Sequence, residues 1–190
     1  MKRLYFFTIL FFGLILNLYS QKDENISKSY ELLSYINLAR TSPVEFAEKY
    51  LSSRRNESTE AEECFLEMIE LDATDELQWS DLLYHSARDH AEDLGSNGLI
   101  GHLGSDSPTL RERVERYAGW KGSIAENIYF GDSSPLEIVI LFLIDEGVED
   151  RGHRKSILNK NFKYSGVSFF PHFYYGTVCV VHFAEFVFPK

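Results

Sequence analysis

Most of the chain as far as residue 144 has the hydrophobic spacing of helices. Tyr30, Leu33 and Ile36 lie three residues apart, and four positions separate Leu83 from Ala87. Such spacings place apolar side chains on one face of a helix, and that face packs against the rest of the protein. Helices are therefore predicted over residues 30–38, 61–71, 81–94 and 108–118, with a polar surface loop over residues 52–62.

Two further helices are predicted from their start signals. Ser42-Pro43-Val44-Glu45 and Ser134-Pro135-Leu136-Glu137 share one pattern. The serine can cap the helix, the proline suits the first helical position, and the glutamate can complete a capping box. The second signal indicates that the apolar run 138–144 is a buried helix rather than a strand.

The final third of the sequence has the composition of strands. Residues 165–173 and 176–188 are rich in Val, Phe, Tyr and Thr, and Tyr174-Tyr175-Gly176 can form a bend between them. Two such neighbouring segments predict a hairpin, and a further strand is predicted over residues 122–130. Helices first and strands last favour an α+β domain in which helices cover an antiparallel sheet.

Residues 1–20 have a different pattern. Lys2 and Arg3 precede an apolar segment over residues 4–16, and a short polar stretch then leads to Ser20. This order is typical of a secretory signal peptide cleaved near Ser20, so we expect a secreted protein. A membrane anchor is the alternative, but a spanning helix needs roughly 20 apolar residues and this segment is shorter. No membrane span is expected after signal removal, and one domain is expected over residues 28–188.

Charge and cysteine content narrow the classes of function. The net charge is −10, which argues against binding to nucleic acid phosphates or anionic membranes. The sequence contains two cysteines, Cys64 and Cys179, which in an exported protein can form one disulfide or remain two buried thiols. Neither is expected to be a nucleophile, because Cys179 lies within a strand pattern and acidic residues precede Cys64.

Two histidines and up to three acids remain as candidates for chemistry. The sequence has no phosphate-binding glycine loop, CxxC pair or GxSxG motif. His102 lies in a glycine-flanked loop, Glu126 lies in the mid-chain strand, and His153 follows Asp145 and Glu146 after a turn. Imidazoles and carboxylates suit a divalent metal such as zinc, and they also suit general acid–base catalysis. They can equally form hydrogen bonds that only join three segments.

Two other histidines, His85 and His90, lie on the helix predicted over residues 81–94. They are five residues apart, whereas a pair of metal ligands on one helix face is three or four apart. His90 borders the apolar stripe, so we expect it to be a packed core or rim histidine.

Four short motifs in a fixed order carry a resemblance to a known family. They are Leu77-Gln78-Trp79, Gly101-His102, Ala125-Glu126-Asn127-Ile128 and Gly152-His153-Arg154-Lys155-Ser156-Ile157-Leu158. Together they resemble the CAP superfamily, which comprises cysteine-rich secretory proteins, antigen 5 and plant pathogenesis-related 1 proteins. The last motif is similar to that of the bacterial SCP-like branch, and the resemblance covers about residues 28–188.

The resemblance implies secretion and a three-layer α-β-α sandwich with a central, mainly antiparallel sheet. It also implies a polar cavity that holds two histidines and two acids. The matching residues are His102, Glu126, His153 and an acid after the helix over 138–144. In the family a Trp usually lies three residues before that acid. Phe142 stands at this position relative to Asp145, and the adjacent Glu146 remains an alternative.

Two classes of function follow from the resemblance and the residues. The first is a secreted, non-enzymatic domain whose cavity can take a divalent cation such as zinc and whose surface binds a lipid, a sterol or an extracellular protein. The alternative is a metal-dependent, protease-like extracellular hydrolase that uses the same cavity. The sequence contains no dedicated nucleophile and no recognised catalytic motif, which favours the first class. No residue is assigned a catalytic role, and no cofactor is required.

Overall fold

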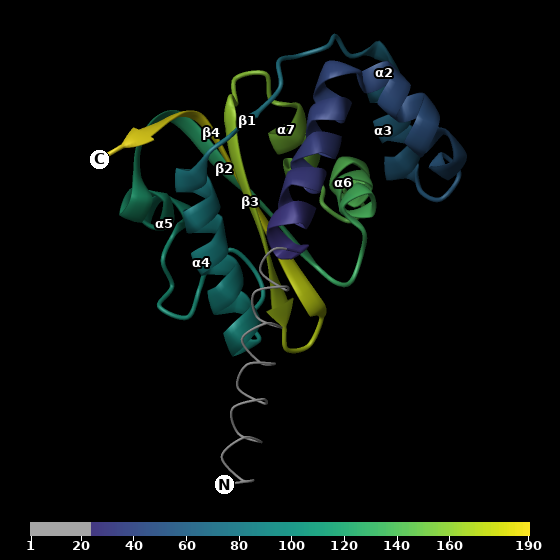
Figure 1. Cartoon of the computed structure of the whole chain (residues 1–190). Coiled ribbons are helices and arrows are strands. Elements are labelled where there is room, and N and C mark those ends of the chain that lie inside the picture. Colours follow the sequence, from purple (N-terminus) through teal and green to yellow (C-terminus); the bar gives the residue numbers. More distant parts are fainter. Residues whose placement is uncertain (1–23) are drawn as a thin grey trace, which may run out of the picture.

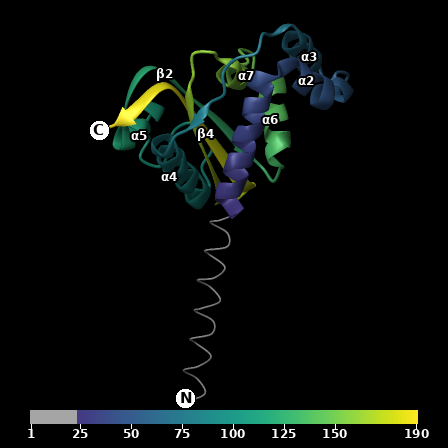
Figure 2. The same ribbon diagram turned by 45° about the horizontal axis from the view of Figure 1, so that its top comes forward.

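The computed structural model describes residues 24–190. The predicted signal peptide over residues 1–20 lies outside the described residues. Helices lie on both sides of a single sheet, as the two views in Figures 1 and 2 show. The predicted three-layer α-β-α arrangement is therefore confirmed.

The first described helix, which we call the N-terminal helix, covers residues 24–41. The remaining helices are α2 (Pro43–Phe46), α3 (Thr59–Glu70), α4 (Asp81–Asn97), α5 (Leu110–Tyr117), α6 (Pro135–Ile144) and α7 (Gly152–Leu158). A π-helical turn, η1 (Ala47–Leu51), and a 3-10 turn, η2 (Ser52–Arg54), continue α2. The strands are β1 (Gln78–Trp79), β2 (Ala118–Phe130), β3 (Tyr164–His172) and β4 (Gly176–Pro189).

The sheet has the strand order β1-β3-β4-β2. The pairs β3–β4 and β2–β4 are antiparallel, and β1 pairs with β3 in parallel. The mainly antiparallel sheet and the C-terminal hairpin are as predicted. The strand β1 was not predicted, because two residues are too few to show the alternation that identifies a strand.

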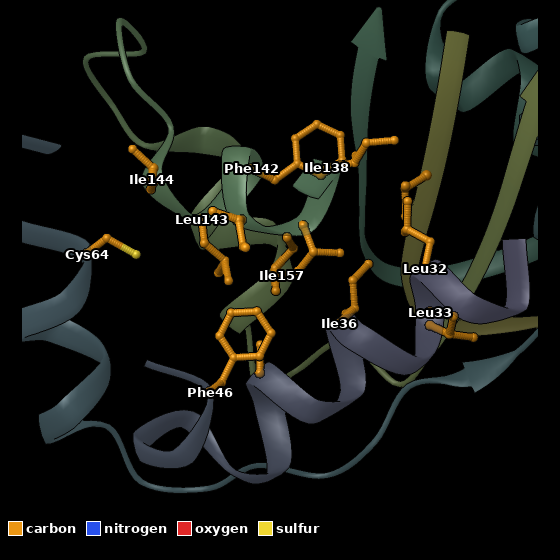
Figure 3. Packing of buried hydrophobic residues seen from close by; sticks show 14 of the residues in the cluster. Leu32, Leu33, Ile36, Phe46, Cys64, Ile138, Phe142, Leu143, Ile144 and Ile157 are labelled. Atoms are coloured by element: carbon orange, nitrogen blue, oxygen red, sulfur yellow. The ribbon is translucent and has the colours of Figure 1, made fainter. Parts of the chain in front are cut away.

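Side chains of β4 alternate between the two helical layers, as the pleat of a strand requires. Cys179, Val181 and Phe183 belong to the larger apolar core, which also contains residues of the N-terminal helix and α6 (Figure 3). Val178 and Val180 pack instead with the buried face of α4. The buried apolar residues of the three clusters all lie within residues 32–184.

Two helix starts differ from the prediction in detail. The helix α2 begins at Pro43 as predicted, but Ser42 makes no side-chain capping bond, and its backbone N–H bonds to the Leu38 carbonyl of the preceding helix at 2.9 Å. The predicted loop over residues 52–62 ends earlier than expected. Ser58 caps α3 by accepting a hydrogen bond from the Ala61 N–H at 3.1 Å, so the helix begins at Thr59.

Both cysteines are buried free thiols, which decides between the two alternatives that the sequence left open. Cys64 lies on α3 and Cys179 on β4. Burial raises the pKa of the Cys64 thiol to about 12 and also raises that of Cys179. Neither is therefore a thiolate at neutral pH. Among residues 24–190, no helix is both long enough and apolar enough to cross a membrane.

Candidate functional site

His102 and Glu126 are in direct contact. His102 lies in the loop between α4 and α5, and its Nδ1 is 2.8 Å from Oε1 of Glu126 on β2. The Glu126 side chain is 2% exposed, whereas that of His102 is 61% exposed. A buried carboxylate of the sheet thus orients an imidazole that faces solvent.

Two further donors complete the surroundings of Glu126. Nε2 of His182 on β4 lies 2.7 Å from Oε2, and Nη2 of Arg113 on α5 lies 2.6 Å from the same oxygen. Burial alone would raise the pKa of Glu126. The hydrogen bonds from His102 and His182 and the nearby charge of Arg113 instead hold its pKa far below the usual range. Glu126 therefore stays ionised at physiological pH.

His90 on α4 is buried beside this carboxylate. Its Nε2 is 3.8 Å from Oε2 of Glu126, too far for a hydrogen bond. Neither ring nitrogen has a hydrogen-bond partner among the described residues. Burial lowers the pKa of His90 to about 4, so the ring is neutral at pH 7. The residue is a packed core histidine, as the sequence indicated.

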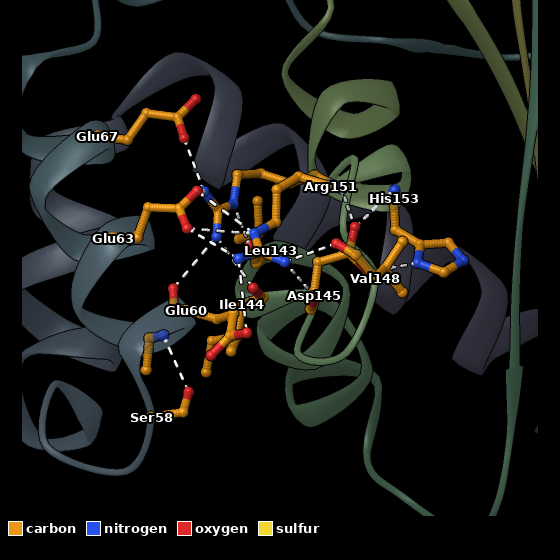
Figure 4. A network of polar contacts seen from close by, with 12 residues as sticks. Ser58, Glu60, Glu63, Glu67, Leu143, Ile144, Asp145, Val148, Arg151 and His153 are labelled. Carbon is orange, nitrogen blue, oxygen red and sulfur yellow. Dashed lines mark hydrogen bonds and ion pairs between the residues drawn. The ribbon is translucent and has the colours of Figure 1, made fainter.

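The second histidine, His153, pairs with Asp145 (Figure 4). Its Nδ1 is 2.6 Å from Oδ1 of Asp145, and its backbone N–H donates to Oδ2 at 2.8 Å. The Arg154 N–H also points to Oδ2 at 3.3 Å. Asp145 ends α6 in the left-handed conformation, with φ of 56°. Its carboxylate thereby reaches the first turn of α7, where a helix favours negative charge.

The acid that faces His153 is Asp145, and Glu146 points to solvent. This result agrees with the position of Phe142, which lies three residues before Asp145. The Phe142 ring also stacks on the His153 ring, with centroids 5.2 Å apart and an interplanar angle of 28°. The aromatic side chain therefore holds one face of the imidazole.

The two pairs meet at neighbouring residues of β2. Successive side chains of a strand point to opposite faces. Glu126 contacts His102 on one face, while the Nδ2 of Asn127 donates to the His153 carbonyl at 3.1 Å on the other. The structure therefore brings each predicted histidine to one predicted acid. Within residues 24–190, no group of three or more His, Cys, Asp or Glu side chains is arranged to hold a metal ion.

The donor chemistry nevertheless suits ligation by imidazole. Each histidine directs Nδ1 to a carboxylate, which is the usual way a protein orients a ligating ring and leaves Nε2 available. In the described part of the chain, Nε2 of His102 and of His153 makes no hydrogen bond. Two imidazoles are fewer protein ligands than the three or four of typical zinc sites. The residues present do not fit a dedicated catalytic zinc centre.

Sequence reasoning did not identify His182 and Arg113 as partners of Glu126. His182 interrupts the apolar pattern of β4, and a polar residue there is a signal of a buried partner. The register that places it opposite Glu126 appears only in the folded sheet. Arg113 lies next to the buried Val114 on α5, and its own side chain is 3% exposed.

We expect Glu126→Gln to lower the free energy of unfolding by about 1–3 kcal/mol. The neutral amide cannot balance the charge of Arg113 or accept all three hydrogen bonds. The pKa of His102, which the hydrogen bond to Glu126 raises above its ordinary value, should fall. Urea denaturation and NMR titration of the imidazole measure the two effects. Glu146→Gln is the control, and an equal response in both variants would contradict the role of Glu126.

We expect His90 to make the protein less stable as the pH falls from 6.5 to 4. The unfolded chain takes up a proton near the ordinary pKa of 6.5, but the folded chain does so only at about 4. The unfolded state therefore binds more protons in this window, which corresponds to a loss of up to about 3 kcal/mol.

His90→Leu should flatten the decline in unfolding free energy, measured by urea denaturation at several pH values. The substitution removes no hydrogen bond of the ring. His102→Ala is the control, because the pKa of His102 is shifted upward, opposite to that of His90. An unchanged slope in His90→Leu would show that another group causes the decline.

Three comparisons place this geometry among known proteins. The model of the CAP family, described as the cysteine-rich secretory protein family, matches residues 33–183. A comparison with curated proteins gives no significant match.

Three solved structures with a similar fold come from bacteria. An extracellular protein with an SCP domain from Bacillus anthracis is 21% identical, with a TM-score of 0.54, over 84% of this chain and 41% of that protein. A cysteine-rich secretory protein from Staphylococcus aureus is 14% identical, with a TM-score of 0.53, over 85% of this chain and 39% of that protein.

An outer surface protein from Borrelia burgdorferi is 19% identical, with a TM-score of 0.50, over 70% of this chain and 93% of that protein. At these identities the likeness concerns the fold. The chain spans about two fifths of the Bacillus and Staphylococcus proteins. The family match covers most of the sequence, and this chain belongs to the cysteine-rich secretory protein (CAP) family.

Proposed function

We propose that this protein is a secreted, non-enzymatic binding domain that acts outside the cell, with a lipid, a sterol or an extracellular protein as its partner. The two polar pairs, Glu126–His102 and Asp145–His153, orient two imidazoles without making either acid available as a base. The observation that carries the proposal is the saturation of Glu126, whose oxygens receive hydrogen bonds from His102, His182 and Arg113.

A general base must be able to accept a proton from a substrate near the working pH. Glu126 has a pKa far below the usual range and a side chain that is 2% exposed. The Asp145 side chain is also 2% exposed, and its oxygens are engaged in hydrogen bonds with Nδ1 of His153 and with two backbone N–H groups. Both acids are placed to position other groups rather than to exchange protons.

Location outside the cell is supported by two independent observations. Residues 1–20 have the charged start, apolar middle and polar end of a secretory signal peptide. The similar bacterial structures are described as extracellular, secretory or outer surface proteins. We therefore propose cleavage near Ser20 and a mature domain over residues 28–188.

The alternative function is a metal-dependent extracellular hydrolase that uses the same two histidines. It would need a nucleophile or a metal-bound water close to a free base. Both cysteines are buried with raised thiol pKa values, and the two acids are engaged as described above. These contacts favour the binding domain.

We expect the purified protein to show no turnover of peptide, ester or phosphoester substrates above that of the double variant His102→Ala/His153→Ala. Removal of both imidazoles abolishes the site but leaves the apolar core intact. Product formation is measured by mass spectrometry with and without added zinc. Turnover that disappears in the double variant would support the hydrolase and contradict the proposal.

A second candidate role is weak binding of a divalent cation by the two imidazoles. It is favoured by the carboxylate–imidazole pairs, each with Nδ1 engaged and Nε2 available. In that role His102 and His153 would hold the ion, while Glu126 and Asp145 would orient the rings. The ion would supply a fixed positive charge to an anionic ligand group.

Zinc should therefore bind more weakly as the pH is lowered, because a ligating imidazole must be neutral. His102 takes up its proton early in such a titration, since the hydrogen bond to Glu126 raises its pKa. Isothermal titration calorimetry at pH 8 and pH 6 measures the effect. Heats that are the same in wild type and His102→Ala/His153→Ala would rule out a metal role for the pair.

A further inference from the structure

The tip of the β3–β4 hairpin exposes three consecutive aromatic side chains. Phe173 is 78% exposed, Tyr174 is 73% exposed and Tyr175 is 47% exposed. We call these three residues the aromatic tip. Ile100, which is 64% exposed, follows Leu99, and the Leu99 carbonyl is hydrogen-bonded to His172 at the base of the hairpin turn. Exposed large aromatic groups in one cluster are unusual on a monomeric surface and indicate an interaction site.

The backbone of the aromatic tip is held in place by His172. The His172 side chain accepts hydrogen bonds at Nδ1 from the N–H groups of Tyr174 and Tyr175, at 3.2 and 3.3 Å. Its Nε2 lies 2.9 Å from the Leu99 carbonyl, to which it donates. The buried ring therefore ties the turn to the end of α4.

Two further contacts brace the rings. Tyr174 lies directly over Gly98, where an added Cβ would come within 2.8 Å of the Tyr174 ring. The Phe173 N–H bonds to the Gly95 carbonyl at 3.3 Å. Both glycines belong to the C-terminal end of α4. The exposed rings are therefore presented by a fixed support and do not need to be ordered when they meet a partner.

The chemistry of the tip suits a lipid interface better than a small ligand. Residues 170–176 contain no Asp, Glu, Lys or Arg. Tyr is enriched at the boundary of a bilayer, where its ring contacts apolar chains and its hydroxyl stays hydrated. Phe is found on the apolar side of segments that bind at the membrane surface. Small molecules bind in concave pockets, whereas residues 173–175 form the turn between β3 and β4, which lies at one end of the molecule in Figure 1.

The aromatic tip lies near the start of the N-terminal helix. Glu24, Asn25 and Lys28 of this helix line a surface cavity together with Pro171 and Thr177 beside the tip. Figures 1 and 2 place the start of this helix at the same end of the molecule as the hairpin turn. The apolar segment 4–16 precedes that start in the sequence. The chain therefore enters the described part of the protein at the end that carries the aromatic tip.

We propose that the aromatic tip inserts into the surface of a lipid bilayer with a neutral, zwitterionic headgroup. The net charge of −10 opposes binding to anionic lipids. The inference rests on the proposed extracellular location and assigns the lipid-binding surface to the hairpin. This surface is separate from the His102 and His153 site.

The test is co-sedimentation of residues 21–190 with phosphatidylcholine vesicles. We expect Phe173→Ser/Tyr174→Ser/Tyr175→Ser to lower the partition coefficient by at least about tenfold, because the apolar area available for burial is lost. The matched control is Phe186→Ser/Phe188→Ser. It removes two phenylalanines of similar exposure, 54% and 51%, toward the other end of β4. This control should bind as the wild type does.

A second readout places the tip directly in the membrane. Phe173→Trp should show a blue-shifted emission and quenching by brominated lipid when vesicles are added, whereas Phe186→Trp should show neither. Replacing part of the phosphatidylcholine with phosphatidylserine should weaken binding. Circular dichroism confirms that each variant is folded, and Phe173→Ser alone keeps the test valid if the triple variant is not.

Equal vesicle binding by wild type and triple variant, or no binding by the wild type, would overturn the proposal. Self-association of the wild type without lipid, lost in the triple variant, would also overturn it by assigning the tip to a second copy of the chain. The turnover experiment judges the non-enzymatic function independently of vesicle binding. Failure of the tip proposal is therefore distinguishable from failure of that function.

Discussion

The negative charge of the buried Glu126 carboxylate needs positive and hydrogen-bonding partners. The rest of the site depends on how the fold supplies them. Its donors come from three separate elements: Arg113 from α5, His182 from β4 and His102 from the loop between α4 and α5. An ionised carboxylate excluded from water is costly unless it is paired and hydrogen-bonded. The same contacts that stabilise Glu126 therefore fix the position of the exposed His102 ring.

The region around α6 and α7 meets a similar requirement with a buried arginine. Arg154 is 1% exposed and donates to the carbonyls of Leu143 and Ile144, at 2.5 and 3.0 Å. These are carbonyls of the last turn of α6, which have no partner within the helix. Glu63 and Glu67 of α3 balance its charge. Arg154 thus secures the turn in which Asp145 orients His153.

The polar site and the aromatic tip are built on the same sheet, but they use the hydrogen bonds of their histidines differently. At the polar site, Glu126 and Asp145 are fully engaged in hydrogen bonds, and Nε2 of each paired histidine is available. At the tip, His172 uses both ring nitrogens to hold the backbone, so the apolar rings remain exposed. At the polar site the acids orient the histidines, whereas at the tip His172 orients the backbone. This division of roles suits the binding domain proposed above.

Much of the fold and half of the site could be predicted because the signals are local. The start of α6 at Ser134-Pro135, the end of α4 at Gly98 and the strand composition of the last third all depend on neighbouring residues. The short motifs around His102, Glu126 and His153 identified the family and the paired residue types. The Ser42-Pro43 signal located the start of α2 as well, although Ser42 makes no side-chain capping bond.

The sequence by itself determined the element types, the α+β class and the histidines and acids of the site, since spacing and capping act over a few residues. Only the tertiary structure decided that Asp145 rather than Glu146 meets His153, because the left-handed end of α6 sets the direction of each side chain. It also decided that His182 and Arg113 surround Glu126. Strand register and helix packing join residues 56 and 13 positions apart in the chain, and no local pattern encodes those distances.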